Sequence, residues 1–281
     1  MLSSAIPIFN REFLIYLREE KRDYFSYRVL KGVGSERTML MNSMAHRVLT
    51  LCDGKKSVAD IIRCQQESYP DVSSKIISHD VNFALTNLTF QGLVRWQTPI
   101  PWKPSSNYVM SVGENLLLAL CDEDSVSAVS DFVNHEQAVN YSSVGVGIDP
   151  LFCGCEMFAY QELMVAALRK ADNAITALLT FSLGIPEDIN LYYSSLSISR
   201  VIVNTIDNLS LLPHLLQSGL KLTVEALESK VDLDVCRTWV PDTDENISFI
   251  KCLCGAGFSP ENRVAIKSVK GECVSFVSRI R

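Results

Sequence analysis

Apolar and polar positions follow different patterns in the two parts of this chain, with the change near residue 100. Aromatic and β-branched residues alternate from Tyr24 to Leu30, which predicts a strand. Thr38–Met41 reads as its returning partner after a turn at Gly32 and Gly34. Apolar residues then recur three times at helical spacing, before a last strand at Leu93–Trp96. Short strands, three helices and a returning strand predict a small winged-helix domain.

Each of the three helical patterns begins at a residue whose side chain can accept hydrogen bonds from the free amides of a helix N-terminus. These residues are Asn42 or Ser43, Ser57, and Ser73 or Ser74. Asp53 and Gly54 close the first helix, because glycine adopts the left-handed conformation without steric cost. Pro70 ends the second helix and Gly92 the third. The helix boundaries of this domain are therefore well marked.

Less regular segments flank the predicted domain on both sides. Ile8–Leu17 is mildly apolar and reads as an arm or short helix that leads into the charged run Arg18–Asp23. Proline and serine concentrate after residue 97, as in a linker. We therefore divide the chain into an arm (1–23), a winged-helix domain (24–97), a linker (98–108) and a second domain (109–281).

The second domain has the pattern of a mixed α/β fold, in which short apolar runs alternate with helical periodicity. The expected strands are Leu116–Leu120, Ala174–Phe181, one or two within Leu191–Val203, Val235–Val240, Val264–Lys267 and Glu272–Val277. The expected helices are Ser125–Val139, Phe158–Lys170, Leu209–Leu227 and Asp242–Gly255. The fold class is accordingly α+β, with a winged-helix domain followed by a mixed α/β domain.

Charge and composition narrow the class of partner. The 281 residues carry a formal net charge of -6, and Lys75 is the one basic residue between Ser73 and Gln91 in the third helix. A winged helix that binds DNA needs a basic face, so nucleic acid is not the expected partner. The nine cysteines lack the regular spacing of a disulfide framework, which indicates a reducing, cytoplasmic location. The opening residues lack a long apolar run, so we expect no signal peptide or membrane span.

The first domain resembles the PqqD-like recognition element that binds precursor peptides of ribosomally made, post-translationally modified natural products. The matching motifs are Asn42-Ser43-Met44-Ala45, Leu51-Cys52-Asp53-Gly54, Ser57-Val58-Ala59-Asp60-Ile61-Ile62 and the closing Gly92-Leu93-Val94. In that family a leader peptide adds as an extra strand to the open sheet edge and rests against the third helix. Unpaired backbone groups of the edge would supply affinity, and side-chain pockets would supply selectivity.

The resemblance implies a set of peptide-binding residues on two elements. On the strand they are Thr38, Met39, Leu40, Met41 and Asn42. On the third helix they are Ile76, Ile77, Asp80, Val81 and Ala84, with Lys75 or His79 at the rim. An alternative stays open at this point, because Val81, Leu85 and Leu88 also fit the core of a small domain.

The end of the second domain resembles a GNAT acyltransferase, in which a strand leads to a helix-capping Asn and the helix runs into Gly-Phe and a final pair of strands. Asn246 and Gly257-Phe258 match this plan. The family's glycine-rich loop binds the pyrophosphate of coenzyme A through backbone amides. The corresponding stretch, Val203–Pro213, has no glycine and carries Asp207, so coenzyme A binding is not favoured.

Other candidate chemistry is sparse. Cys153-Gly154-Cys155 and Cys252-Leu253-Cys254 could offer four thiolates to zinc, but structural zinc sites usually space their cysteines farther apart. Asp122-Glu123-Asp124 reads as a helix-capping turn, with a metal-ligand role as the alternative. The four histidines are scattered. We therefore assign no metal ligands and no catalytic residue.

These observations favour a binding protein that recognises a leader peptide and delivers it to a separate modifying enzyme, as a heterodimer and without a cofactor of its own. Domain order and size resemble the partner subunit of an iron oxygenase in 3-thiaglutamate-type biosynthesis, where the enzyme carries the iron. The second domain would then be a docking platform. Two alternatives stay open: a self-contained peptide N-acyltransferase that uses acyl-coenzyme A, and a transcriptional regulator with a ligand-binding second domain.

Overall fold

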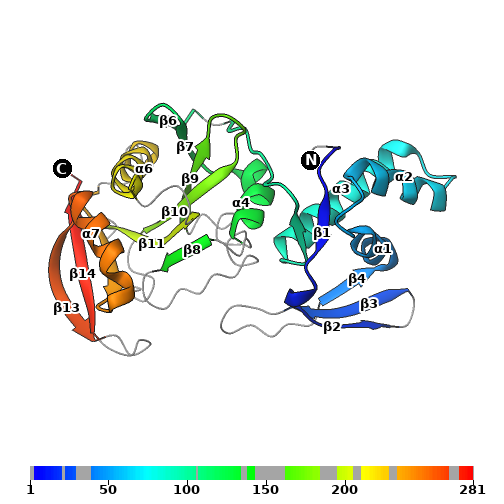
Figure 1. The fold of residues 1–281 in the computed structure, drawn as a ribbon, viewed down its shortest axis with the longest axis horizontal. Helices are drawn as coiled ribbons and strands as arrows, with labels where there is room; N and C mark the ends of the chain where they lie inside the picture. Colours follow the sequence, from blue (N-terminus) through cyan, green and yellow to red (C-terminus); the bar gives the residue numbers. More distant parts are fainter. Residues whose placement is uncertain are drawn as a thin grey trace. The chain divides into compact units, whose positions relative to one another are not determined.

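The computed structural model describes residues 3–20, 23–29, 39–105, 107–133, 138–142, 162–183, 195–204, 210–227, 233–265 and 272–280. These residues form two units (Figure 1). The first unit contains the described residues up to Ile100 together with helix α4 (Val126–Val133). The second unit contains the other described residues from Pro101 onward. Sequence analysis had placed the segment of α4 in the second domain.

The first unit has a three-stranded antiparallel sheet in the order β2-β3-β4. Its strands are β2 (Leu14–Glu19), β3 (Tyr24–Val29) and β4 (Met39–Asn42). A second, two-stranded ribbon joins β1 (Pro7–Phe9) to β5 (Val94–Trp96). Strand β5 is thus paired outside the main sheet, and the expected winged-helix arrangement is not confirmed.

The segment Ile8–Leu17, expected to be an arm or short helix, instead belongs to the fold of the first unit. It forms β1, the short 3-10 helix η1 (Arg11–Phe13) and β2. The backbone amides of Val58 and Ala59, at the start of the second helix, donate to the carbonyls of Ala5 and Ser3. The prediction failed because the apolar residues of β2 do not alternate cleanly, since the pairing with β3 shifts register between Leu14 and Tyr16.

The three helices begin where their caps were expected. They are α1 (Ser43–Leu51), α2 (Val58–Ser68) and α3 (Ser74–Phe90). The side chains of Asn42, Ser57 and Ser73 accept hydrogen bonds from the backbone amides of Ala45, Asp60 and Ile76, respectively. These contacts satisfy amides that would otherwise lack a partner inside the helix. The inner faces of the helices then pack on β3, β4 and β5 to form the core.

A mixed sheet of nine strands forms the second unit, with the order β13-β14-β12-β11-β10-β9-β7-β6 and with β8 paired to β11. The first five strands are β6 (Val109–Val112), β7 (Leu116–Leu120), β8 (Ala138–Ser142), β9 (Glu162–Arg169) and β10 (Ile175–Leu183). The others are β11 (Ser195–Asn204), β12 (Val235–Pro241), β13 (Ser259–Ala265) and β14 (Glu272–Arg279). Among these pairings β11–β12 is parallel and the others are antiparallel.

Strand β9 overturns the helix expected at Phe158–Lys170. Its residues, from Glu162 to Arg169, are almost all buried. A strand buried on both faces is a continuous apolar run, which periodicity alone does not distinguish from a buried helix.

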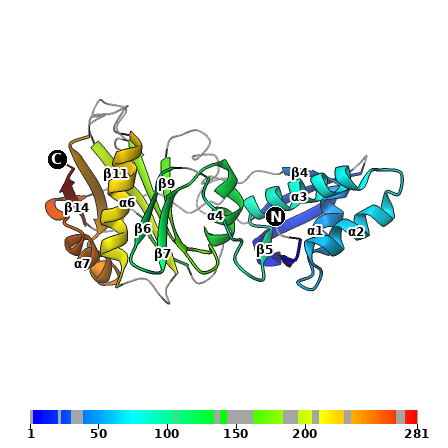
Figure 2. The same cartoon turned by 90° about the horizontal axis from the view of Figure 1, so that it is seen from above.

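Helices α6 (Leu212–Leu227) and α7 (Ile247–Gly255) contribute to one hydrophobic core with the sheet. Helix α6 lies on one face of the sheet (Figure 2). Two further 3-10 turns are η2 (Glu123–Ser125) and η3 (Asp244–Asn246). A Cβ atom added at Gly219 of α6 would lie 2.5 Å from the Cδ1 atom of Leu179. Glycine therefore permits the close approach of helix and sheet. The chain is a mixed α and β protein, and no helix in its described part is long and apolar enough to cross a bilayer.

Candidate peptide-binding surface

Strand β4 is the edge of the three-stranded sheet, and no other described strand pairs with its far side. Its register with β3 places Met41 opposite Phe25 and Leu40 opposite Ser26. Met41 is buried in the core, whereas the side chain of Leu40 on the opposite face is 66% exposed. The predicted edge therefore exists over Met39–Asn42, while Thr38 lies outside the described residues.

Helix α3 divides the predicted contact residues between its two faces. Ile77, Val81 and Ala84 are buried in the core. For Val81 this agrees with the alternative left open by the sequence, whereas Ile77 and Ala84 had been expected only at the peptide-binding face. The solvent-facing residues include Lys75, Ile76, His79 and Asp80 from the predicted set. Helical geometry separates these groups, because residues one position apart differ by about 100° around the axis.

Phe83 is an exposed residue that the sequence analysis missed. Its side chain is 65% exposed, and its ring stacks against that of His79 with the centroids 6.5 Å apart. Phe83 lies seven positions after Ile76, which is the spacing of residues on one helix face. That spacing could have identified it. We call Ile76, His79, Asp80 and Phe83 the α3 stripe.

The sheet edge and the α3 stripe expose three large apolar side chains, Leu40, Ile76 and Phe83, each more than half accessible. Single exposed apolar residues are common on protein surfaces. Here, however, two of them share one helix face and the third lies on the edge strand of the same unit. Covering the exposed half to two thirds of such a side chain would contribute roughly 1–2 kcal/mol to binding.

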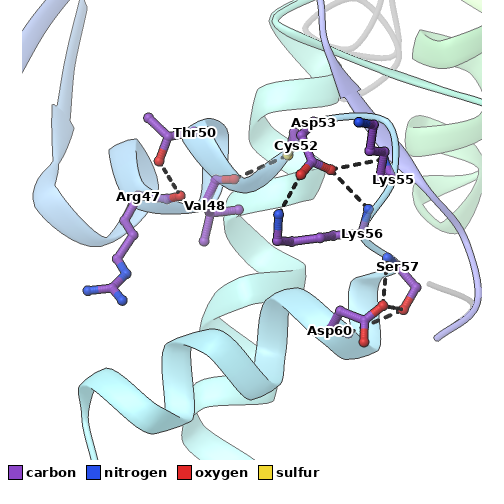
Figure 3. A network of polar contacts seen from close by, with 9 residues as sticks. All are labelled: Arg47, Val48, Thr50, Cys52, Asp53, Lys55, Lys56, Ser57 and Asp60. Atoms are coloured by element: carbon purple, nitrogen blue, oxygen red, sulfur yellow. Dashed lines mark hydrogen bonds and ion pairs between the residues drawn. The ribbon is translucent and has the colours of Figure 1, made fainter.

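The motif residues between α1 and α2 and at the start of α2 form a network of hydrogen bonds and ion pairs (Figure 3). The Asp53 carboxylate accepts hydrogen bonds from the amides of Lys55 and Lys56, each at 2.9 Å, and pairs with the Lys56 ammonium group. The Lys56 side chain and the two amides lower the pKa of Asp53 well below its usual range. Asp60 accepts in turn from the Ser57 amide and hydroxyl. These residues fix the turn that orients α2.

A buried acid in α4 contacts the end of the β5 segment. Asp131 is 5% exposed and accepts a hydrogen bond from the backbone amide of Ile100 at 3.2 Å. Burial raises the pKa of Asp131 to about 7, against the opposing effect of backbone hydrogen bonds from Ile100 and Trp96. This carboxyl group anchors α4 within the first unit.

The pairing of β11 in the second unit bears on whether that unit could transfer an acyl group. Strand β11 pairs with β12 only through Ser195–Ser197, and beyond that point β8 pairs with β11 over Arg200–Asn204. The parallel strands therefore do not present an open edge there. The candidate phosphate loop Val203–Pro213 includes Asp207, and its residues 205–209 lie outside the described residues.

Asn246 was expected to cap α7, but its side chain does not do so. Its amide nitrogen donates to the carbonyl of Pro241 at 3.1 Å and to the hydroxyl of Thr243 at 3.0 Å, which fixes the turn after β12. Gly257 follows α7 with a φ of +89° and leads into Phe258, which is buried.

Of the two cysteine pairs considered as zinc ligands, the structure describes only Cys252 and Cys254. Cys252 and Cys254 lie on α7, where the first is half-buried and the second exposed, and burial raises the pKa of Cys252. Cys153 and Cys155 lie outside the described residues. Among the residues with assigned positions, no three His, Cys, Asp or Glu side chains are grouped to hold a metal ion.

Comparison with known proteins identifies the first unit. Residues 28–94 match the family described as coenzyme PQQ synthesis protein D (PqqD). This region, about a quarter of the 281 residues, includes β4 and α3. The first unit is therefore PqqD-like. No curated protein matches the chain in sequence.

Solved acetyltransferase structures are similar to part of the chain at low identity. The ribosomal-protein-S5-alanine acetyltransferase from Vibrio fischeri has a TM-score of 0.45 at 9% identity, over 61% of this chain and 96% of that one. The aminoglycoside acetyltransferase AAC(6')-Ib, in complex with coenzyme A and kanamycin, gives 0.43 at 14% identity, over 59% and 95%. An acetyltransferase from Salmonella typhimurium that modifies the N-terminal serine of ribosomal protein L7/L12 gives 0.43 at 12%, over 62% and 99%.

Proposed function

We propose that this protein recognises the leader segment of a ribosomally made precursor peptide and delivers it to a separate modifying enzyme. The observation that carries the proposal is the edge strand β4 of a PqqD-like domain, whose outer side is not paired with any described strand. The leader adds to β4 as a fourth strand, and its side chains rest on the α3 stripe. The backbone of β4 supplies hydrogen bonds that do not depend on the leader's sequence, while α3 supplies selectivity.

The second unit serves, in this proposal, as a platform that binds the modifying enzyme in a heterodimer. Its last elements follow the GNAT plan, since β12 is followed by α7, Gly257-Phe258 and the pair β13–β14. The free edge of β11 is taken by β8, and the sequence after β11 lacks the glycines that a phosphate cradle needs. We therefore infer a GNAT-like scaffold without an acyl-coenzyme A cofactor, while any iron belongs to the partner enzyme.

A peptide N-acyltransferase is the second candidate, and the GNAT-like order of elements favours it. The two functions differ in what the second unit binds. Calorimetric titration of the full chain with acetyl-coenzyme A is expected to show no binding at millimolar concentration. Saturable binding at micromolar concentration would favour the acyltransferase instead.

Peptide recognition itself is tested by panning a displayed library of random 12-residue peptides against the full chain. We expect enrichment of peptides that bind the first unit and that compete with one another for a single site. Failure to enrich any peptide that binds in solution would contradict the proposal.

A further inference from the structure

From the α3 stripe we infer that the bound peptide carries a basic side chain between two apolar ones, at alternate positions of its strand. This inference rests on the proposed function and names the chemistry of the peptide. It depends on the order of side chains along the stripe, in which the acid Asp80 lies between the apolar residues Ile76 and Phe83.

The three side chains share one face of α3. Ile76, Asp80 and Phe83 are spaced by four and three residues, which keeps them within about 60° around the helix axis. Their Cα atoms span about 10.5 Å along the axis at 1.5 Å per residue. Alternate residues of a strand face the same side and recur every ~6.7 Å. Three successive same-face residues of an added strand therefore span about 13 Å, which is enough to reach from one end of the stripe to the other.

The carboxylate of Asp80 is available to a partner. It is exposed, and no ion pair to it is formed by the residues with assigned positions. Two other acids of this unit do form ion pairs, Asp53 with Lys56 and Asp60 with Arg63. Lys75 lies five positions before Asp80, a spacing that does not bring two side chains together on a helix.

When a peptide binds, the Asp80 carboxylate should select for a basic residue in that peptide. The side chains on either side of Asp80, Ile76 and Phe83, are more than half exposed and would lose water against apolar residues of the peptide. A carboxylate that is desolvated between them needs a cation or hydrogen-bond donor. A Lys or Arg of the peptide meets that need, while an Asp or Glu at the same position is repelled. The favoured pattern is apolar, any residue, basic, any residue, apolar.

The test uses the same 12-residue displayed library on three forms of the full chain: wild type, Asp80→Lys and the control Glu67→Lys. Glu67 is an exposed acid on α2, so its substitution makes the same change of charge on another helix. We expect wild type and Glu67→Lys to enrich peptides with a basic central residue, and Asp80→Lys to enrich an acidic one. Circular dichroism of each variant confirms that it is folded.

The most enriched peptide is then synthesised with Lys and with Glu at the central position, and both are titrated by fluorescence anisotropy. Exchange of Asp80 for Lys should weaken binding of the Lys peptide at least about fivefold, because it removes the ion pair and adds repulsion between like charges, and it should strengthen binding of the Glu peptide. The inference is wrong if the enriched peptides show no charge preference at the central position, or if Asp80→Lys leaves that preference unchanged. Either result would leave the proposed function standing. If the wild-type chain enriches no peptide at all, both this inference and the proposed function are wrong.

Discussion

At the scale of single residues, the structure separates side chains that build the PqqD-like unit from side chains that remain for a partner. Asp53 and Asp60 belong to recognisable motifs, yet their hydrogen bonds hold a turn and a helix start. Phe83 belongs to no motif and is largely exposed. The residues available to a peptide are therefore better found from exposure and helix face than from the motif.

Phe83 should be central to peptide affinity. Replacing Phe83 with Ala removes most of the apolar area of the α3 stripe, so binding of a peptide selected from the displayed library should weaken by about 1–3 kcal/mol. Stability should change little, because the ring is mostly exposed in the free protein. The control is Tyr108→Ala, which removes an exposed aromatic ring from the second unit. Equal losses of affinity in the two variants would contradict a specific role for Phe83.

Asp131 should make stability depend on pH. Its pKa of about 7 in the folded chain lies above the value near 4 of an unfolded aspartate, so folding retains a proton that unfolding releases. Stability should therefore fall as pH rises from about 4 to 7, by at most about 1.4 kcal/mol per pH unit. In Asp131→Asn the amide oxygen can still accept the Ile100 hydrogen bond, but it cannot ionise. Thermal unfolding across this range should show a smaller loss for the variant, and identical profiles would refute the assignment.

At the scale of elements, capping and core residues could be predicted from the sequence, and pairing partners could not. The starts of α1, α2 and α3 follow from local hydrogen bonds by Asn42, Ser57 and Ser73. The pairing of β1 with β5 joins segments far apart in the chain, and no local pattern specifies it. Strand β9 was mistaken for a helix because burial on both faces removes the alternation that identifies a strand.

The contact between α6 and β10 should tolerate no added side-chain atom. Gly219→Ala places a methyl group against buried Leu179, so the free energy of unfolding should fall by about 1–3 kcal/mol. Gly255→Ala in α7 is the matched control, because its Cβ atom would approach Pro213 no closer than 3.4 Å. Chemical denaturation of the two variants measures the difference. A loss at Gly255 as large as at Gly219 would show that close packing is not the cause.

At the scale of the whole molecule, the chain joins a PqqD-like unit with an open sheet edge to a larger mixed sheet. Part of the candidate surface could be predicted: of the expected edge Thr38–Asn42, the residues Met39–Asn42 form an edge strand, whereas Ile77, Val81 and Ala84 proved to be core. The sequence could place residues on α3, but it could not show which face the other helices would cover. That choice depends on tertiary packing.

The central claim is that a peptide joins the sheet at β4, and amide hydrogen exchange tests it most directly. The full chain is compared with and without a peptide selected from the displayed library. Binding should slow exchange in β4 and leave β2 unchanged, since β2 is the opposite edge of the same sheet. Protection at β2, or a bound peptide that leaves the exchange of β4 unchanged, would contradict the account.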